Sequence, residues 1–309
     1  MTARPTIIDC DPGTDDAIAL FLALASPELD VRLVSVVGGN VGLDHTLRNA
    51  RAVVGLTGRA VPVVAGADRP LLGRFVPAAH VHGADGLGGL ALPGGPAAAP
   101  GIAVDAIRSL LRAAPPRGVT LIGLGPATNL GLALAVEPAL AGRVAEIVLM
   151  TGAQGEGNVT PAAEFNAYND PEALAVVLGC GAPVTLATLE VTHQALCRAE
   201  EIAALRAAGD GACLRAAAAI WERTPPASRS GGLGMAQHDA CAVAWAVAPH
   251  LFKSVEVFAE VDCGPGPGRG RTVLAQWARG GRAANARMLT ELDSAAFFTL
   301  LNARLAALP

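Results

Sequence analysis

Lysine is almost absent from this chain of 309 residues, where Lys253 is the only one. Charged residues make up 16% of the sequence and the formal net charge is −4, which leaves no basic surface for a nucleic acid. The low charge and the abundance of Ala, Gly and Val indicate a globular chain rather than a disordered one. No internal repeat and no convincing linker divides it, so we predict a single domain over residues 1–309.

Cysteine pairs and membrane segments are also missing. The six cysteines form no C-x-x-C pair and no zinc spacing, so we expect most of them to be reduced residues packed in apolar runs. Met1 runs almost directly into the first predicted strand, which leaves no room for a signal peptide. Residues 119–136 carry no charge, but their glycines, proline and asparagine favour a strand, a turn and a helix over a membrane span. We therefore expect a cytoplasmic protein with no membrane partner.

What the sequence does contain is a dense group of aspartates near its start. The segment Thr6–Ala17 joins a predicted buried strand to a predicted apolar helix, and Pro12 and Gly13 make the turn between them. Four aspartates lie in this segment, namely Asp9, Asp11, Asp15 and Asp16. Because the carboxyl ends of strands border the ligand crevice of open α/β sheets, the last three should point into that crevice.

Two interpretations of these aspartates are open. Carboxylates stabilise the positive end of a helix, so a single Asp at this place indicates a helix cap. Four within eight positions repel one another and raise one another's pKa, and a hard cation relieves that repulsion. Carboxylate oxygens are the ligands that calcium and magnesium take in proteins. The spacing therefore favours a metal site.

Strand-like and helix-like segments alternate along the chain. Predicted strands cover residues 31–37, 61–65, 119–122, 144–150, 184–189, 255–261, 272–277 and 287–291. Predicted helices cover residues 44–56, 104–112, 128–136, 170–178, about 200–223 and 294–305. Such alternation is typical of βαβ units, so the predicted fold is α/β, with an open, mostly parallel, Rossmann-like sheet flanked by helices. Residues 69–100 are rich in Gly and Pro, and we predict a long functional loop there.

Two further polar clusters follow later strands. Glu156-Gly-Asn158 and Ala163-Glu-Phe-Asn166 come after the strand that ends at Met150, on the same edge of the sheet as the aspartate turn. They are either a loop of Asx turns or a site for a polyhydroxyl ligand, because each hydroxyl group both donates and accepts hydrogen bonds. Gln237-His-Asp239 opens a later helix, where Asp239 is either a helix cap or a functional carboxylate.

The aspartate turn, Asp9-Cys-Asp-Pro-Gly-Thr-Asp-Asp16, resembles the signature of the nucleoside hydrolases, the calcium-dependent N-ribohydrolases related to inosine–uridine hydrolase. Other segments similar to that family follow in the expected order over nearly the whole chain. They are Val37-Gly-Gly-Asn40, His80-Val-His-Gly83, Gly125-Pro-Ala-Thr-Asn129, Glu156-Gly-Asn158, Ala163-Glu-Phe-Asn166, Asn169-Asp-Pro-Glu172, Val191-Thr-His193 and His238-Asp239. The resemblance implies the nucleoside hydrolase fold, usually assembled as a homodimer or homotetramer.

The resemblance also implies the residues of the site. Calcium would be bound by three carboxylates and one backbone carbonyl, those of Asp11, Asp16, Asp239 and Leu124. The ribose of a ribonucleoside would be held by the substrate-binding residues Asp15, Asn40, Asn158, Glu164 and Asn166, and Phe165 belongs to the same segment. Asp11 would be the general base on a calcium-bound water that attacks with inversion. His238 would be a candidate acid on the nucleobase side, which His82 also lines.

The residue types suit this chemistry, because carboxylates stabilise the oxocarbenium charge that develops on the ribose and a metal lowers the pKa of its water. Glu190 stands where the family usually has Asp, and Thr151 stands where Gly is common. The segment 224–234, expected beside the base pocket, lacks the aromatic residues of some relatives, so the base preference stays open.

Two alternatives to a nucleoside hydrolase are considered. A haloacid-dehalogenase-type phosphatase also begins with Asp-x-Asp, but it needs a downstream lysine, and Lys253 is the only lysine of the chain. A calcium-dependent ribose- or nucleoside-binding protein without turnover is the other. The presence of Asp11, His238 and Asp239 favours an enzyme over that binding protein.

Overall fold

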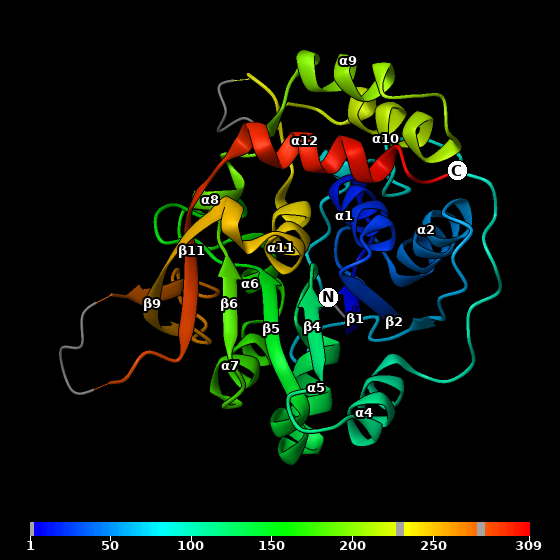
Figure 1. The fold of residues 1–309 in the computed structure, drawn as a ribbon. Coiled ribbons are helices and arrows are strands. Elements are labelled where there is room, and N and C mark those ends of the chain that lie inside the picture. Colours follow the sequence, from blue (N-terminus) through cyan, green and yellow to red (C-terminus); the bar gives the residue numbers. More distant parts are fainter. Residues whose placement is uncertain (1–2, 227–231, 277–281) are drawn as a thin grey trace.

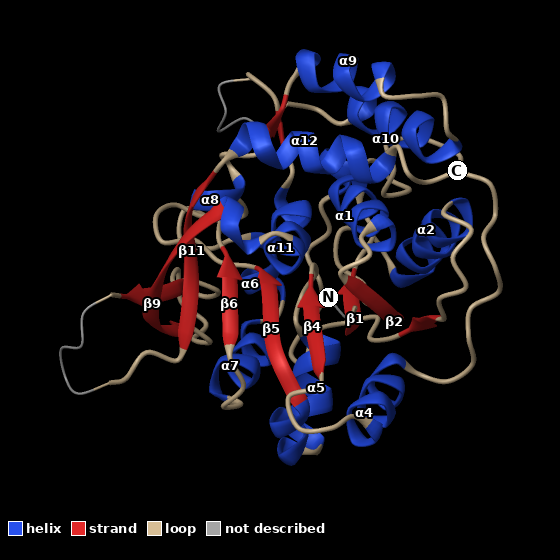
Figure 2. Cartoon of the chain, in the orientation of Figure 1, coloured by secondary structure: helices blue, strands red, loops and turns tan. Residues whose placement is uncertain are grey.

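We describe the fold from a computed structural model of the chain, over residues 3–226, 232–276 and 282–309. Within these ranges, nine strands form one twisted sheet in the order β10-β9-β11-β6-β5-β4-β1-β2-β3, flanked by helices (Figures 1 and 2). The strands of this sheet are β1 (Arg4–Cys10), β2 (Leu29–Val36), β3 (Val63–Ala65), β4 (Val119–Gly123), β5 (Val144–Met150), β6 (Val184–Ala187), β9 (Phe252–Val261), β10 (Thr272–Ala275) and β11 (Ala286–Leu292). A second, two-stranded sheet pairs β7 (Leu196–Cys197) with β8 (Met235–Ala236).

The central part of the nine-stranded sheet is parallel, from β3 through β6 to β11, and within this sheet only β9 and β10 run antiparallel to their neighbours among the described strands. The order reverses between β1 and β4, because the chain moves outward from β1 to β2 and β3 and then returns to the other side of β1. Open α/β sheets bind ligands at the carboxyl ends of the strands at such a switch point. The aspartate turn follows β1 and therefore lies at this switch point.

Helices cover both faces of the sheet. They are α1 (Thr14–Ala25), α2 (Leu43–Leu56), α3 (Ala79–His82), α4 (Ala103–Ala113), α5 (Thr128–Val136), α6 (Phe165–Asn169), α7 (Pro171–Gly179), α8 (Leu189–Thr192), α9 (Ala199–Ala207), α10 (Ala212–Arg223), α11 (His238–Val247) and α12 (Ser294–Leu305), with short 3-10 helices η1 (Pro138–Arg143) and η3 (Pro249–Leu251). In the view of Figure 1, β4, β5 and β6 point up toward the side where α9, α10 and α12 lie.

Two hydrophobic cores, one on each face, hold the layers together. Ile8 and Cys10 of β1 pack with α1, α10, α11 and α12, whereas Ile7 packs with α4, α5 and α7 on the opposite face. Successive side chains of a strand point to opposite faces, so β1 contributes to both cores. By the same alternation Asp9 lies on the side of Ile7, where it accepts a hydrogen bond from Asn129 of α5 at 2.8 Å.

The predicted α/β class is confirmed, since the sheet is mostly parallel and flanked by helices. One predicted strand, residues 184–189, was too long, because β6 ends at Ala187. Thr188 then occupies the N-cap position of α8, and the apolar run continues as a buried helical turn instead of a strand. The end of the predicted strand 272–277 lies at Trp277, outside the described residues, while β10 ends at Ala275.

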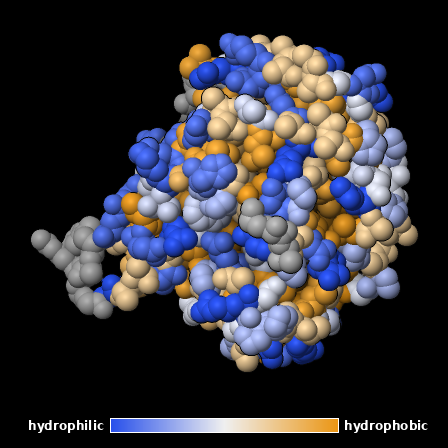
Figure 3. Space-filling view, in the orientation of Figure 1, coloured by the Kyte–Doolittle hydropathy of each residue, from blue (hydrophilic) through white to orange (hydrophobic). Residues whose placement is uncertain are grey.

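The remaining features concern the surface and the cysteines. Hydrophilic and hydrophobic residues intermix over the face of the molecule in Figure 3. Among the helices that the structure describes, none combines the length and the apolar character needed to cross a membrane. All six cysteines are free and four are buried, as expected for packing residues. Cys263 differs, because it lies exposed in the Gly- and Pro-rich segment after β9.

Candidate active site

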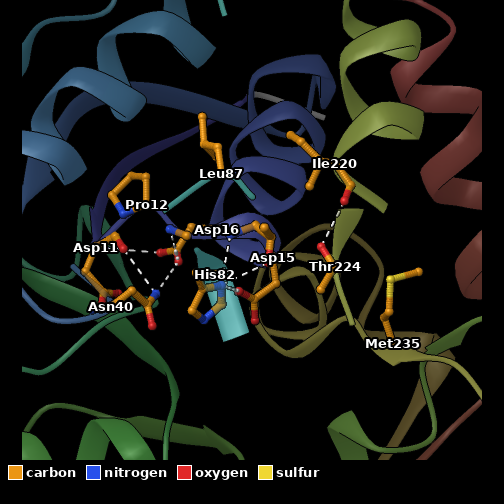
Figure 4. Close-up of polar contacts among 12 residues, drawn as sticks. Asp11, Pro12, Asp15, Asp16, Asn40, His82, Leu87, Ile220, Thr224 and Met235 are labelled. Atoms are coloured by element: carbon orange, nitrogen blue, oxygen red, sulfur yellow. Dashed lines mark hydrogen bonds and ion pairs between the residues drawn. The ribbon is translucent and has the colours of Figure 1, made fainter. Parts of the chain in front are cut away.

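The aspartate turn folds back on itself through its own carboxylates (Figure 4). Asp16 lies in the first turn of α1, and its carboxylate accepts hydrogen bonds from the backbone N–H groups of Gly13 at 3.0 Å and Asp11 at 3.2 Å. Asn40, which follows β2, donates from its side-chain amide to Asp16 Oδ2 at 3.1 Å and from its backbone N–H to Asp11 Oδ2 at 2.7 Å. Asp16 therefore does cap α1, and the same bonds fix the positions of both carboxylates.

Two glycines leave just enough room for the carboxylate of Asp11. A Cβ atom at Gly39 would overlap Asp11 Oδ2, and one at Gly125 would overlap Asp11 Oδ1. The side chain is 1% exposed, yet Oδ1 has no hydrogen-bond partner in the described structure. A buried carboxylate oxygen without a partner carries a large desolvation cost. A bound cation would offset this cost, so the observation fits a metal site.

Three further carboxylates converge beside Asp11. Asp15, Asp16 and Asp239 each place an oxygen so that these atoms lie within 4.8 Å of one another. Burial raises the pKa of Asp15 to about 6, and burial followed by the charge of Asp15 raises the pKa of Asp16 to about 6. Burial and then the neighbouring aspartates also raise the pKa values of Asp11 and Asp239. The cluster is compatible with a metal site, because a cation stabilises all of the charged forms at once.

The carbonyl oxygen of Leu124 lies at the same edge of the sheet, just after β4. It accepts a hydrogen bond from Asn166 Nδ2 at 2.6 Å, and this nitrogen also donates to the carbonyl of Met150 at 2.9 Å. Both amide hydrogens of Asn166 are therefore used within the protein. Its Oδ1 is the atom left to accept a hydrogen bond from a ligand hydroxyl.

Glu164 and Asn158 are oriented by backbone N–H groups. Glu164 caps α6, with Oε1 accepting from Asn166 at 2.8 Å and Oε2 accepting from Gly152 at 2.8 Å and Ala167 at 3.0 Å. Asn158 Oδ1 accepts from the backbone N–H of Phe165 at 2.8 Å, which leaves its Nδ2 as a donor. Asx-type turns and a polar ligand site were alternative interpretations of this loop, and the bonds support both.

Two histidines border the cluster. His82 Nδ1 lies 3.2 Å from the backbone nitrogen of Thr14, 2.9 Å from its hydroxyl and 4.0 Å from Asp15 Oδ1, while burial lowers the pKa of His82 to about 4. His238 Nδ1 lies 2.7 Å from the hydroxyl of Thr192. Burial and then His193 lower the pKa of His238 to about 3, so its imidazole is neutral and offers an N–H group rather than a positive charge.

A pocket of about 690 Å³ opens over the cluster. Its lining includes all seven predicted substrate-binding residues, Asp15, Asn40, His82, Asn158, Glu164, Phe165 and Asn166, as well as Leu124, His238 and Asp239. Asp11 and Asp16 are absent from the lining because they are buried below it. The volume lies within the range of about 300–1,000 Å³ that is usual for small-molecule sites.

Sequence reasoning missed part of the pocket wall. Trp221 of α10 donates its indole N–H to Gln237 Oε1 at 2.9 Å, and both residues are buried and line the pocket. The adjacent His238 was the available signal for Gln237, and the nearby segment 224–234, expected beside the base pocket, was the available signal for Trp221. Thr224, Pro225 and Pro226 also line the pocket, while residues 227–231 of the predicted base-side segment lie outside the described residues.

The two departures from the family pattern each have a contact in the structure. Thr151 places its hydroxyl 3.3 Å from Glu164 Oε2, so it adds a donor to a carboxylate of the pocket. Glu190 of α8 accepts hydrogen bonds from the backbone N–H groups of Gln154 at 3.0 Å and Gly155 at 2.9 Å. Although burial raises the pKa of Glu190, these bonds bring it below its ordinary value. Glu190 thus anchors the loop that carries Asn158.

The fold and the site together define an open α/β enzyme with a metal-compatible carboxylate cluster beneath a small-molecule pocket. The chain belongs to the inosine-uridine preferring nucleoside hydrolase family, whose sequence model matches residues 6–299. It is accordingly an enzyme of the ribonucleoside hydrolase type. The resemblance noted in the sequence is confirmed, and so is the nucleoside hydrolase fold.

Individual relatives match along almost their full length. The chain is 42% identical to the pyrimidine-specific ribonucleoside hydrolase RihA of Citrobacter koseri, over 98% of each chain. Among solved structures, a plant nucleoside hydrolase, PpNRh1, is 30% identical with a TM-score of 0.90 over 98% of this chain and 99% of that one. A purine-preferring ribonucleoside hydrolase from Gardnerella vaginalis is 29% identical, with a TM-score of 0.91 over 98% of each chain.

Proposed function

We propose that the protein is a calcium-dependent hydrolase that splits the N-glycosidic bond of pyrimidine ribonucleosides into the free base and ribose. The observation that carries this proposal is the buried Asp11 Oδ1, which lacks a partner among the described residues beside the cluster of Asp15, Asp16 and Asp239. The pocket above this cluster has room for a nucleoside and is lined with groups that bind hydroxyls.

Calcium would be held by the carboxylates of Asp11, Asp16 and Asp239 and by the carbonyl of Leu124. These are oxygen ligands throughout, as a hard cation requires. When bound, the ion would lower the pKa of a water molecule and orient the ribose hydroxyls. Asp11 and Asp16 belong to the aspartate turn, Leu124 follows β4 and Asp239 lies at the start of α11, so the fold brings three distant parts of the sequence to one place.

The reaction needs a base at one end of the site and a hydrogen-bond donor at the other. Asp11 Oδ1 takes a proton from the attacking water, whose oxygen forms the new bond to C1′ of the ribose. The bond between C1′ and the nucleobase nitrogen breaks with inversion, and its electron pair leaves with the base. The buried carboxylates stabilise the positive charge that develops on the sugar. Water attacks directly, because the mechanism requires no covalent intermediate.

The residues divide between the two halves of the substrate. Asp15, Asn40, Asn158, Glu164 and Asn166 bind the ribose hydroxyls, with Asn166 accepting through Oδ1 and Asn158 donating through Nδ2. Phe165 is on the same wall, and His82 and His238 lie on the nucleobase side. The neutral imidazole of His238 gives the departing base a hydrogen bond or a proton, which a poor leaving group needs.

Pyrimidine ribonucleosides are the proposed substrates because the relatives at 41–42% identity are pyrimidine-specific hydrolases, whereas the purine-preferring and inosine–guanosine enzymes are 28–29% identical.

The phosphatase alternative finds no support, because Lys253 lies on β9 with its ammonium group 2.6 Å from Glu291 and largely exposed. The homodimer or homotetramer and the cytoplasmic location stay predictions.

A nucleoside panel tests the proposal. We expect free ribose from uridine and cytidine in the presence of calcium, and much less from inosine and adenosine. Asp15 and calcium are proposed to bind the 2′-hydroxyl, so 2′-deoxyuridine should be a poorer substrate by roughly 10⁴-fold in kcat/KM. Uridine monophosphate, assayed for inorganic phosphate, is the control for phosphatase activity. Binding of uridine without release of ribose would instead indicate a nucleoside-binding protein.

A further inference from the structure

The imidazole of His238 has a buried partner that the proposed mechanism does not use. Thr192, the last residue of α8, is fully buried, and its hydroxyl lies 2.7 Å from His238 Nδ1. His238 lines the pocket and Thr192 does not. Since Nδ1 faces Thr192, the ring edge that carries Nε2 is the one left to contact a ligand in the pocket.

The threonine hydroxyl has a single proton and two possible acceptors. His238 Nδ1 is at 2.7 Å, whereas the carbonyl oxygen of Leu189 is at 3.5 Å, the far limit of a hydrogen bond. Donation to Nδ1 is therefore the stronger arrangement. In a neutral imidazole one nitrogen donates and the other accepts, so an accepting Nδ1 requires the proton to sit on Nε2.

We propose that Thr192 is a positioning residue that holds His238 in the tautomer with its proton on Nε2, directed at the departing nucleobase. This inference rests on the role of His238 in the proposed function. The opposite tautomer would turn a lone pair toward the base, which then could receive no hydrogen bond as it leaves. Thr192 thereby supplies orientation and tautomer and does not touch the substrate.

Hydrogen bonds and ring packing fix the elements around Thr192 and His238. The short helix α8 is tied to β11 by Gln194, whose amide donates to the carbonyl oxygens of Glu190 and Thr290 at 2.9 Å and accepts from the backbone N–H of Leu292 at 2.9 Å. The ring of His193 packs edge-on against His238, with centroids 5.3 Å apart.

The test compares two variants on two substrates at saturating calcium. Thr192→Val keeps the shape of the side chain and removes the hydroxyl, whereas Thr192→Ser keeps the hydroxyl. We expect Thr192→Val to lower kcat for uridine by roughly 10–100-fold, as the loss of one hydrogen bond to a reacting group does, with little change in KM. Hydrolysis of 4-nitrophenyl riboside should change far less, because nitrophenolate leaves without help. Thr192→Ser should resemble the unsubstituted enzyme on both substrates.

A matched control and a second readout separate this role from simple packing. Thr188→Val removes another buried hydroxyl, at the start of α8, and should leave the ratio of the two substrates unchanged. Nitrogen-15 NMR of histidine-labelled enzyme should show His238 protonated on Nε2, with its signals assigned by their loss in His238→Ala. In Thr192→Val the same signals should indicate a mixture of the two tautomers.

The possible outcomes distinguish the role of Thr192 from the role of His238. Equal losses on both substrates in Thr192→Val, or an equal loss in Thr192→Ser, would overturn the role of Thr192 alone. A proton on Nδ1 of His238 in the unsubstituted enzyme would do the same. If His238→Ala itself hydrolyses uridine at full rate, the role of His238 in the proposed function fails, and the inference about Thr192 fails with it.

Discussion

Asp11 and His238 act, on this account, at opposite ends of one bond. Asp11 serves the attacking water and the metal, so Asp11→Ala should lower kcat for uridine and for 4-nitrophenyl riboside alike. His238 serves only the leaving group, so His238→Ala should slow uridine by roughly 10²–10⁴-fold and spare the nitrophenyl substrate. Asp44→Ala, an exposed aspartate at the start of α2, is the control. Equal losses on both substrates in His238→Ala would instead mean that His238 only supports its neighbour Asp239 on the metal.

Asp9 gives a second prediction at the residue scale, because it is buried and its Oδ2 has no hydrogen-bond partner among the described residues. Burial raises its pKa to about 7, against the hydrogen bonds from Ser35 and Asn129. Between about pH 4 and pH 7 the native state holds a proton on Asp9 that the unfolded state has lost, so stability falls as pH rises. Asp9→Asn keeps both bonds to Oδ1 and has nothing to titrate.

The measurement is the melting temperature of chelator-treated protein at pH 5 and pH 8. From pH 5 to pH 8, the melting temperature of Asp9→Asn should rise by a few degrees relative to that of the unsubstituted protein, because the part of the pKa shift between pH 5 and pH 7 corresponds to about 3 kcal/mol. For the control Asp44→Asn, the difference in melting temperature from the unsubstituted protein should be the same at both pH values. A constant difference between Asp9→Asn and the unsubstituted protein at both pH values would show that Asp9 does not titrate in this range.

At the scale of elements, α8 connects both halves of the site, since Thr192 contacts His238 and Glu190 anchors the loop after β5. Glu190→Ala should loosen that loop, which carries Asn158, and raise KM for uridine about 5-fold, as expected for about 1 kcal/mol of lost hydrogen bonding. kcat should stay within about twofold. Glu190→Gln retains an acceptor for the two N–H groups and should leave KM unchanged. An equal rise in KM for the alanine and glutamine variants would show that the charge, and not the anchoring, matters.

Elements with a clear local pattern could be predicted from the sequence. The helices at residues 128–136 and 294–305 and the strand at residues 144–150 have the predicted bounds, because a cap or a turn marks their ends. The strand predicted over residues 184–189 was too long, because a continuous apolar run does not show where a buried strand becomes a buried helical turn. Periodicity alone does not separate the two.

The site could be predicted only as far as its motifs reach. The segments similar to the family contain all seven predicted substrate-binding residues, and all seven line the pocket, because each belongs to a compact motif. Their roles stay predictions. Trp221 and Gln237 were not among the predicted site residues, since the hydrogen bond between them joins α10 to the start of α11 and no local spacing predicts it. The role of Thr192 likewise depends on a distance between two elements that only the folded chain brings together.

At the scale of the whole molecule, we expect the cluster to make stability depend on the proposed metal. Asp15 and Asp16 belong to α1 and Asp239 to α11, with Asp11 beside them just after β1, and these carboxylates repel one another when no cation is bound. Calcium at 100 times its Kd should therefore stabilise the chelated protein by about 2.7 kcal/mol and raise its melting temperature. Asp16→Ala should show a much smaller rise, and Asp44→Ala the full rise. If neither chelation nor added calcium changes the melting temperature, these segments do not share a metal ion.

The proposed function requires that this carboxylate cluster use calcium to hydrolyse ribonucleosides, and the release of free ribose is the most direct measure of that reaction. The measurement is ribose release from uridine by exhaustively chelated enzyme, before and after calcium is added back, with the bound metal determined by elemental analysis. The account predicts no release without metal and restored release with about one calcium ion per chain, in keeping with the single cluster of Asp15, Asp16 and Asp239 found among the described residues. Full ribose release by protein that contains no metal would contradict it.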